Sequence, residues 1–164
     1  MADTTLNVNE PVAHSDLGCM LFCKDGDKFK YLVPVRAVPA THSAPGTIEV
    51  TEMDSPIKQY IADRPDVPAY EFDYNYTSAK YAAVKAKADG KIEHEYLITY
   101  GDKSGVKFKG TGFTWRDAVS MGGEIKGKLS IIVNKVDDVA DCTSIIDTAT
   151  IPAGRVHPFT TQTA

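Results

Sequence analysis

The chain has 164 residues, of which 43% are hydrophobic, so length and composition predict one compact domain with a single core. Its net charge of −4 argues against a nucleic-acid-binding protein, because duplex affinity depends largely on lysine and arginine side chains that neutralise phosphates. The longest apolar run near the N-terminus covers only residues 19–23, and no basic segment precedes it. We therefore expect no secretory signal, no membrane insertion and a soluble product made in a cytoplasm.

The residue types favour β-structure. Eight tyrosines, six phenylalanines and one tryptophan accompany frequent valine, isoleucine and threonine, and glycine, proline and aspartate interrupt the chain at short intervals. Aromatic and β-branched residues are enriched in strands, and the interrupting residues are typical of turns. This composition argues against an all-helical fold.

The first third of the chain predicts a hairpin and a projection. Residues 1–15 are polar and lack periodicity, so we expect an N-terminal arm. Strands are predicted at 17–24 and 28–38, joined by a turn at 25–27. Pro34 and Pro39 cannot donate to a strand ladder, so the chain is expected to leave the sheet and form a projecting loop over 37–46.

The next segment predicts a strand, a short helix and a second strand. Residues 47–53 are β-branched, and Ser55 and Pro56 then suit the cap and first turn of a helix over 57–61. Residues 70–76 show the clearest alternation in the sequence, which predicts a strand with one apolar and one polar side. The apolar side carries Tyr70, Phe72, Tyr74 and Tyr76, and the polar side carries Glu71, Asp73 and Asn75.

The remainder predicts one helix followed by antiparallel strands. The helix covers 79–88, with Ser78 as its cap and Asp89-Gly90 at its end. Strands follow at 91–100, 106–115 and 124–134, and residues 151–164 are expected to form a C-terminal arm. The predicted fold is mainly β, an antiparallel β-sandwich or barrel of about seven or eight strands with one flanking α-helix, over residues 16–150. The core candidates are Tyr70, Phe72, Tyr74, Tyr81, Val84, Tyr96, Ile98, Phe108, Leu129 and Ile131.

No residue pattern predicts catalysis, a cofactor or a metal. The glycines at 105–112 lack the Gly-Lys-Ser/Thr of a phosphate loop, and no serine stands in a Gly-x-Ser-x-Gly elbow. Asp137, Asp138 and Asp141 lack the spacing of a calcium loop. Cys19 and Cys23 lie too far apart on a strand to form a disulfide, so reduced thiols are expected. We expect a protein that is not an enzyme, with no cofactor and no metal.

The aromatic stripe at 70–76 has three interpretations. Four aromatic residues at a period of two can form a β core, a contact between subunits or, together with Trp115, a platform on which sugars stack. The third interpretation gives the first alternative function, a monomeric carbohydrate-binding β-sandwich.

The order of the elements resembles that of major tail tube proteins from bacteriophages with long, non-contractile tails of the siphophage type. The resemblance covers about residues 17–147, and three segments carry it. They are GTIEVT at 46–51 with the following DSP at 54–56, the strand and helix over 70–88, and FKGTGF at 108–113. None of the three is a catalytic signature, and their order is what identifies the family.

The resemblance implies a structural virion protein. Members of this family are β-sandwiches with a flanking helix, close into hexameric rings, and stack as a hollow tube through which DNA passes during ejection without specific binding. The implied partners are further copies of the chain, a tape-measure protein and tail-tip proteins. The implied location is the virion tail, after assembly in the cytoplasm of the host bacterium. A tube-like subunit of type VI secretion is the second alternative.

Two sets of residues follow from this expectation. A lumen that passes DNA should repel phosphates, so acids on the polar sides of strands are lumen candidates: Glu49, Glu71, Asp73, Glu93 and Glu95. The projecting loop and the C-terminal arm supply the candidates for contacts between rings or subunits: Val38, Thr41, His42, Pro45 and Phe159. Residues 1–76 carry 12 acids and 6 bases, whereas residues 77–164 carry 10 acids and 12 bases, an asymmetry compatible with head-to-tail contact between copies.

Overall fold

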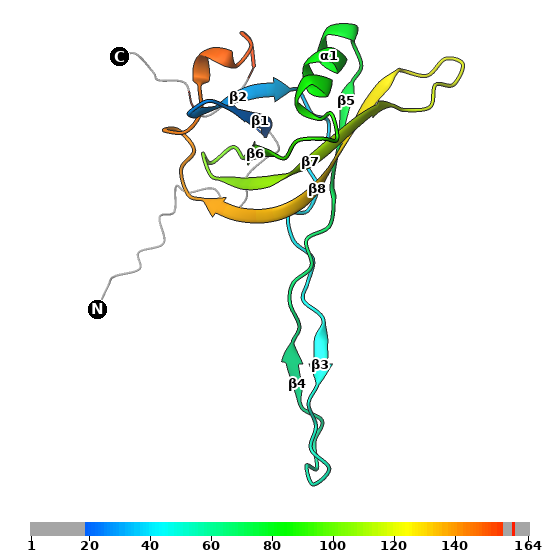
Figure 1. Cartoon of the computed structure of the whole chain (residues 1–164), viewed down its shortest axis with the longest axis vertical. Coiled ribbons are helices and arrows are strands. Elements are labelled where there is room, and N and C mark those ends of the chain that lie inside the picture. Colours follow the sequence, from blue (N-terminus) through cyan, green and yellow to red (C-terminus); the bar gives the residue numbers. More distant parts are fainter. Residues whose placement is uncertain (1–18, 156–158, 160–164) are drawn as a thin grey trace, which may run out of the picture.

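The structure, a computed structural model, describes residues 19–155 and 159 (Figure 1). The described residues form eight strands, one α-helix and one short 3-10 helix. These are β1 (Met20–Asp25), β2 (Lys28–Val33), β3 (Thr47–Glu49), β4 (Tyr60–Ala62), β5 (Tyr70–Asn75), α1 (Ser78–Lys87), β6 (His94–Thr99), β7 (Gly105–Arg116), β8 (Lys126–Val139) and η1 (Thr148–Thr150). The predicted N-terminal arm at 1–15 lies outside the described residues.

Six strands form one antiparallel sheet in the order β2-β1-β6-β7-β8-β5. The sheet curls so strongly that its two ends approach each other (Figure 1). Just after β2, the Arg36 backbone N–H donates to the Asp73 carbonyl on β5 at 2.8 Å, and the Arg36 guanidinium pairs with Glu124. The prediction of a mainly antiparallel β-sandwich or barrel with one flanking helix is confirmed.

The inside of the curl is an aromatic core. On β5 the alternation places Tyr70, Phe72 and Tyr74 inside, each at most 1% exposed. The Phe108 ring on β7 meets Tyr70 edge-on at 4.8 Å between centroids and stacks on Tyr96 at 5.6 Å. Burial of each such side chain stabilises the fold by about 1.5–3 kcal/mol. All the core candidates except Tyr81 lie in this core.

Tyr81 was wrongly placed in the core. It is half-buried on α1, 5.6 Å from Tyr76, with the Arg116 guanidinium 4.4 Å from its ring centroid. The helix has a narrow apolar stripe, so Val84 and Ala88 alone fill its side of the core. The helix begins one residue earlier than predicted because the Thr77 side chain, rather than Ser78, caps it by accepting from the Lys80 N–H at 3.2 Å.

The predicted helix over 57–61 is wrong, because a bend at 56–57 leads into the strand β4 at Tyr60–Ala62. β4 pairs with β3 in a separate two-stranded sheet, and Figure 1 shows that the two strands extend far from the curled sheet. Ser55 takes part in the turn at the tip, where its hydroxyl donates to the Ile57 carbonyl. The predicted loop at 37–46 is one leg of this hairpin. We name residues 46–66 the projecting hairpin.

A second apolar cluster lies on the opposite side of the sheet. Residues of the C-terminal segment pack there against β1, β2 and β6, with Cys142, Ile146, Ile151 and Phe159 all buried. Phe159 is only 4% exposed, so its assignment as a contact between subunits is wrong for this arrangement. Apolar side chains of the C-terminal arm are held by their own chain because the sheet offers Phe22, Phe29 and Leu97 as partners.

Gly127 is expected to be intolerant of any side chain. It stands opposite Tyr74 in the β5–β8 ladder, and a Cβ at Gly127 would lie 2.2 Å from the Tyr74 ring. Gly127→Ala should therefore lower the free energy of unfolding by about 1–3 kcal/mol, as overpacking does. Urea unfolding measures this, with Gly46→Ala as a control because a Cβ there meets its nearest neighbour at 3.6 Å. Equal stability of the two variants would contradict this packing.

Phe159→Ala should destabilise the isolated subunit. Removal of a buried phenylalanine ring costs about 3 kcal/mol, since it leaves a cavity in the second apolar cluster. The midpoint of urea unfolding should fall in monomeric protein, before any assembly takes place. A midpoint equal to that of the wild type would contradict the burial of Phe159 in the isolated subunit, and Phe159 would then be available for contacts between subunits.

Candidate assembly surfaces

The outer side of the curled sheet presents rows of charged side chains. We name it the open face, and define it by the residues that alternate with the aromatic core along β5 to β8 and β1. Its carboxylates are Glu71, Asp73, Glu93, Glu95 and Asp137, and its lysines are Lys24, Lys107, Lys109, Lys128 and Lys135. Four of the predicted lumen residues therefore share one face, and Glu49 does not, because it lies on the projecting hairpin.

The open face is charge-balanced rather than acidic. Lys24 Nζ lies 2.9 Å from Glu95, Lys128 Nζ lies 3.3 Å from Asp73, and the Lys109–Glu93 pair is at 3.9 Å. The hydrogen bond from Lys24 lowers the pKa of Glu95, and the hydrogen bond to Asp73 raises the pKa of Lys128. Each shift favours the charged form, so this face carries both signs at neutral pH.

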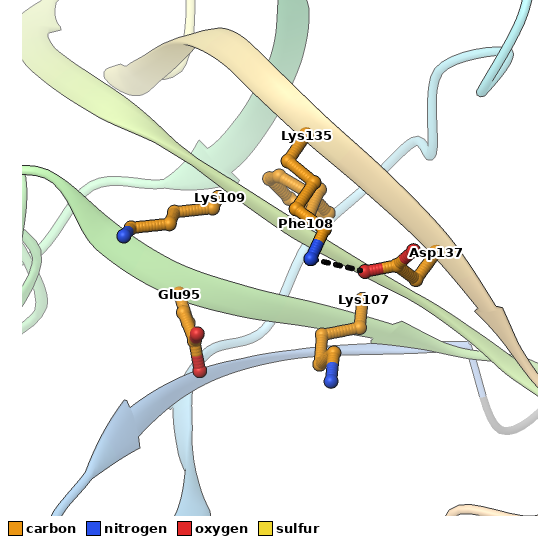
Figure 2. A pocket seen from close by; sticks show the side chains of 6 residues that line it. All are labelled: Glu95, Lys107, Phe108, Lys109, Lys135 and Asp137. Atoms are coloured by element: carbon orange, nitrogen blue, oxygen red, sulfur yellow. Dashed lines mark ion pairs between the residues drawn. The ribbon is translucent and has the colours of Figure 1, made fainter.

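A pocket of about 140 Å³ lies on this face (Figure 2). Its lining consists of Glu95, Lys107, Phe108, Lys109, Lys135 and Asp137. Lys135 and Asp137 form an ion pair across one side at 3.6 Å. The pocket is smaller than the usual size of a small-molecule site, about 300 Å³ or more, and it is lined mainly by paired charges.

The projecting hairpin has one apolar and one polar side. Ile48 and Ile61 are cross-strand partners, and the period of two places Val50 beside them. We name these three residues the hairpin face; they are 45%, 52% and 40% exposed, respectively. On the other side Glu49 pairs with Lys58 at 3.8 Å. An isolated two-stranded hairpin is marginally stable in water, so this exposed apolar side marks a surface for a partner.

A second exposed apolar surface lies on β7 and β8 beyond the end of the β6 ladder, on the same side of the sheet as the open face, where Trp115 stands opposite Lys128. Phe113, Trp115 and Ile132 project from the same side of this ladder, and we name them the β7–β8 patch. They are 43%, 42% and 55% exposed. Sequence reasoning missed Phe113 and Ile132 as surface residues. The spacing of two between Phe113 and Trp115 indicates that both side chains lie on the same side of a strand, but it does not indicate that this side is exposed.

The chain itself pairs with part of each outer strand of the sheet. Along β2, the Phe29 N–H donates to the Ile145 carbonyl at 2.9 Å, and Asp147 donates back to Phe29 at 2.9 Å. Along β5, Arg36 occupies the Asp73 carbonyl. On β7, by contrast, the β6 ladder stops at Gly110, and beyond it the described contacts are a single bridge between Asp89 and Phe113 with a hydrogen bond from Gly90.

The predicted contact residues of the loop lie at the base of the projecting hairpin. Val38 is half-buried against the aromatic core, and the Thr41 carbonyl accepts the hydroxyl of Tyr70. His42 and Pro45 are exposed further along the same leg. Thus Val38 and Thr41 anchor the hairpin to the sheet, and only the other two present side chains to solvent.

The aromatic stripe cannot serve as a sugar platform. Tyr70, Phe72 and Tyr74 are buried, so of the proposed stacking residues Trp115 is the one that presents a broadly exposed ring. Tyr76 is half-buried and covered by Arg116, whose Nε donates to the Tyr76 hydroxyl at 3.0 Å. Among the three interpretations of this stripe, the structure selects the β core for its first three members.

The described part of the chain offers little to reactive chemistry. It holds no group of three or more histidine, cysteine or acidic side chains arranged to bind a metal ion. Burial raises the pKa of both Cys23 and Cys142 to about 11, so these thiols stay protonated at neutral pH. Within the same residues, no helix has the length and apolar character needed to span a bilayer.

Comparison with known proteins gave similarity in structure alone. No protein-family model matches the sequence, and no curated protein matches it either. A chain in the tube terminating cap of the anti-feeding prophage superposes with a TM-score of 0.58 at 13% identity, covering 84% of this chain and 98% of that chain. A chain in the sheath-tube complex of the extracellular contractile injection system PVC gives 0.57 at 11% identity, with coverages of 84% and 97%.

A third match comes from the 6-fold symmetrised baseplate of the anti-feeding prophage. Its TM-score is 0.54 at 4% identity, and it covers 79% of this chain and 97% of that chain. All three matches span nearly the whole of the chains they match, so the likeness concerns the complete fold rather than a fragment. The protein therefore has a fold of the phage-tail-tube type, which it shares with chains of the tube cap, tube and baseplate complexes of contractile injection systems.

Proposed function

We propose that this protein is a non-catalytic structural subunit that assembles into hexameric rings, which stack as the tail tube of a long-tailed bacteriophage. The observation that carries the proposal is the projecting hairpin, which exposes Ile48, Val50 and Ile61 far from any core of its own chain. Such a surface gains stability only when a partner covers it. The tail-tube-like fold favours further copies of the chain as that partner, and the proposal adds a tape-measure protein inside the tube and tail-tip proteins at its end.

The route to a ring differs from simple pairing between outer strands. The chain itself pairs with Phe29 on the β2 edge and with the Asp73 carbonyl on the β5 edge, so these edges offer fewer free backbone groups. The projecting hairpin and the part of β7 beyond Gly110 keep free backbone groups along their edges. These two edges lie on different parts of the molecule. Contacts between unlike surfaces are heterologous, and a heterologous contact closes into a ring when its rotation is an integral fraction of a turn.

We assign the open face to the lumen. A channel for DNA must avoid strong phosphate contacts, and lysines whose charges are matched by adjacent carboxylates attract phosphate weakly. The pairs Lys24–Glu95, Lys109–Glu93 and Lys128–Asp73 give this property. DNA would then pass without specific binding, with balanced charge taking the place of the acidic lining expected from sequence.

A tube subunit of a contractile injection system is the second candidate. The solved chains described above come from such systems and match this protein with TM-scores of 0.54 to 0.58. The two candidates share ring assembly and differ in whether a sheath surrounds the tube. Isolation of tubes from the source organism would distinguish the two candidates, because a contractile system would yield a sheath protein together with the tube.

Shortening the projecting hairpin tests ring assembly. Replacement of residues 47–62 by an Asn-Gly turn should leave the curled sheet folded, because the aromatic core uses no residue of this segment. Negative-stain electron microscopy of concentrated wild-type protein should show rings or hollow tubes, and the shortened protein should show neither. Circular dichroism and urea unfolding check that both proteins are folded. Tubes from the shortened protein would exclude the hairpin as the assembly element.

Charge reversal tests the lumen assignment. Glu71→Lys with Asp73→Lys removes the carboxylates beside Lys128 and adds two positive charges to the open face. Assembled tubes of this variant should retain fluorescent duplex DNA at low salt and lose it as salt rises, whereas wild-type tubes should retain little. Asp27→Lys with Asp138→Lys, two exposed acids outside both the open face and the projecting hairpin, is the control for net charge. Equal retention by all three tubes would place the open face outside the lumen.

A further inference from the structure

Two elements of this chain, the projecting hairpin and the helix α1, carry exposed charges of opposite sign. We propose that the projecting hairpin of one copy lies along the exposed side of α1 in a second copy, where Glu52 and Asp54 pair with Lys85 and Arg116. The inference rests on the proposed function and adds the surface that receives the hairpin. Because α1 packs on the core side of the sheet, this contact leaves the open face clear.

The tip of the projecting hairpin is acidic. Glu52 and Asp54 are exposed there, and neither forms an ion pair within the part of the chain that the structure describes. Glu49, by contrast, pairs with Lys58 at 3.8 Å. Residues 46–66 contain five acids and two bases, a net charge of −3. The hairpin therefore presents carboxylates that a basic partner can neutralise.

The helix α1 is basic, and two exposed cations lie beside its Tyr81. Lys85 Nζ is 5.7 Å from the centroid of the Tyr81 ring, and the Arg116 guanidinium is 4.4 Å from it. Neither cation pairs with a carboxylate of residues 19–155. Residues 78–91 contain four bases and one acid, a net charge of +3. This charge is equal in size and opposite in sign to that of the hairpin.

The outer side of α1 is made of short side chains. Val84 and Ala88 face the core. The helical period therefore places alanines on the opposite side, where they are exposed: Ala79, Ala82 and Ala86. A two-stranded ribbon can approach such a surface closely, since no long side chain stands between the helix and the strands.

The apolar side of the hairpin matches the helix in length. The segment from Ile48 to Glu52 spans about 13 Å at the rise of a strand, and the ten residues of α1 span about 15 Å at the rise of a helix. The hairpin face is aliphatic and 40% to 52% exposed. When it is packed along α1, it becomes one layer of a sheet-on-helix contact, an arrangement that shields apolar side chains from water.

The hairpin and α1 cannot meet within one chain. Figure 1 shows α1 at one end of the longest axis and the projecting hairpin at the other. The hairpin is fixed at its base, where the Asp63 N–H donates to the Gly46 carbonyl at 2.8 Å and the Tyr70 hydroxyl donates to the Thr41 carbonyl. Each copy can therefore give its hairpin to one neighbour and receive a hairpin from another, which is the heterologous contact that a ring requires.

Charge selects a second copy as the occupant of α1. The acidic hairpin and the basic helix attract each other, whereas two hairpins or two helices repel. The acidic first half of the sequence contains the hairpin, and the more basic second half contains the helix. The open face offers less attraction to a hairpin, because Lys24, Lys109 and Lys128 already have carboxylate partners in their own chain.

Charge reversal tests the contact. Glu52→Lys with Asp54→Lys gives the hairpin variant, and Lys85→Glu with Arg116→Glu gives the helix variant. All four side chains are exposed, so both proteins should remain folded, which urea unfolding checks. Each variant alone should raise the protein concentration needed for ring assembly at least about tenfold, because like charges brought together at an interface oppose association.

Restoring opposite signs gives the decisive result. A chain with all four substitutions has a basic hairpin and an acidic helix, so it should assemble at the wild-type concentration in sedimentation velocity. A 1:1 mixture of the hairpin variant and the helix variant should also assemble, since every contact between unlike chains joins a basic element to an acidic one. Asp27→Lys with Asp138→Lys is the matched control, because it changes the net charge as the hairpin variant does; it should assemble like the wild type.

A crosslink checks the position of the contact. Val50→Cys with Ala82→Cys in one chain, treated with a short bis-maleimide in assembled rings, should give a ladder of linked multimers, and each single variant should give no ladder. Rings without this ladder, or a folded fourfold variant that does not assemble, would overturn the contact while leaving the tube function standing. A wild-type protein that stays monomeric at every concentration and beside its assembly partners would overturn both.

Discussion

The packing of aromatic side chains inside the curled sheet is the interaction on which the rest of the structure depends. Phe108 on β7 contacts both Tyr70 on β5 and Tyr96 on β6, which brings strands far apart in the sheet order around one core. Glycines make room for this, as Gly127 does under the ring of Tyr74. The curl also brings the end of β2 to β5, where Arg36 joins the two ends of the sheet.

A sheet that closes on its own core leaves its remaining apolar residues with no place inside. The projecting hairpin extends away from the curl, and Phe113, Trp115 and Ile132 lie on the outer side of the curled sheet, so these apolar side chains face solvent in the single chain. The C-terminal segment, by contrast, shields apolar surface from solvent, because it covers the β2 edge and the apolar part of the outer side. The chain therefore protects some of its edges by itself and leaves two elements for other molecules.

The same geometry places the charged side chains on the outer side of the sheet, beside the β7–β8 patch, where Trp115 stands opposite Lys128. Along β5 the alternation that buries Tyr70 and Phe72 turns Glu71 and Asp73 outward, and the neighbouring strands place lysines beside them. The result is a face that is polar and balanced in charge, suited to line a passage rather than to bind.

The sequence alone determined the strands at the core, the helix and the fold class, because alternation at a period of two and a capped helical segment are local patterns. It also placed four of the acids on one side of their strands. It could not determine the strand at 60–62, since Ser55-Pro56 suits a helix start as well as a hairpin turn, and pairing with β3 decided between them. Likewise, only the tertiary structure paired the acids with lysines, buried Phe159, and left Phe113 and Ile132 in solvent. These outcomes depend on which segments distant in the sequence come into contact. Local periodicity describes the two sides of a single element and carries no information about its distant partners.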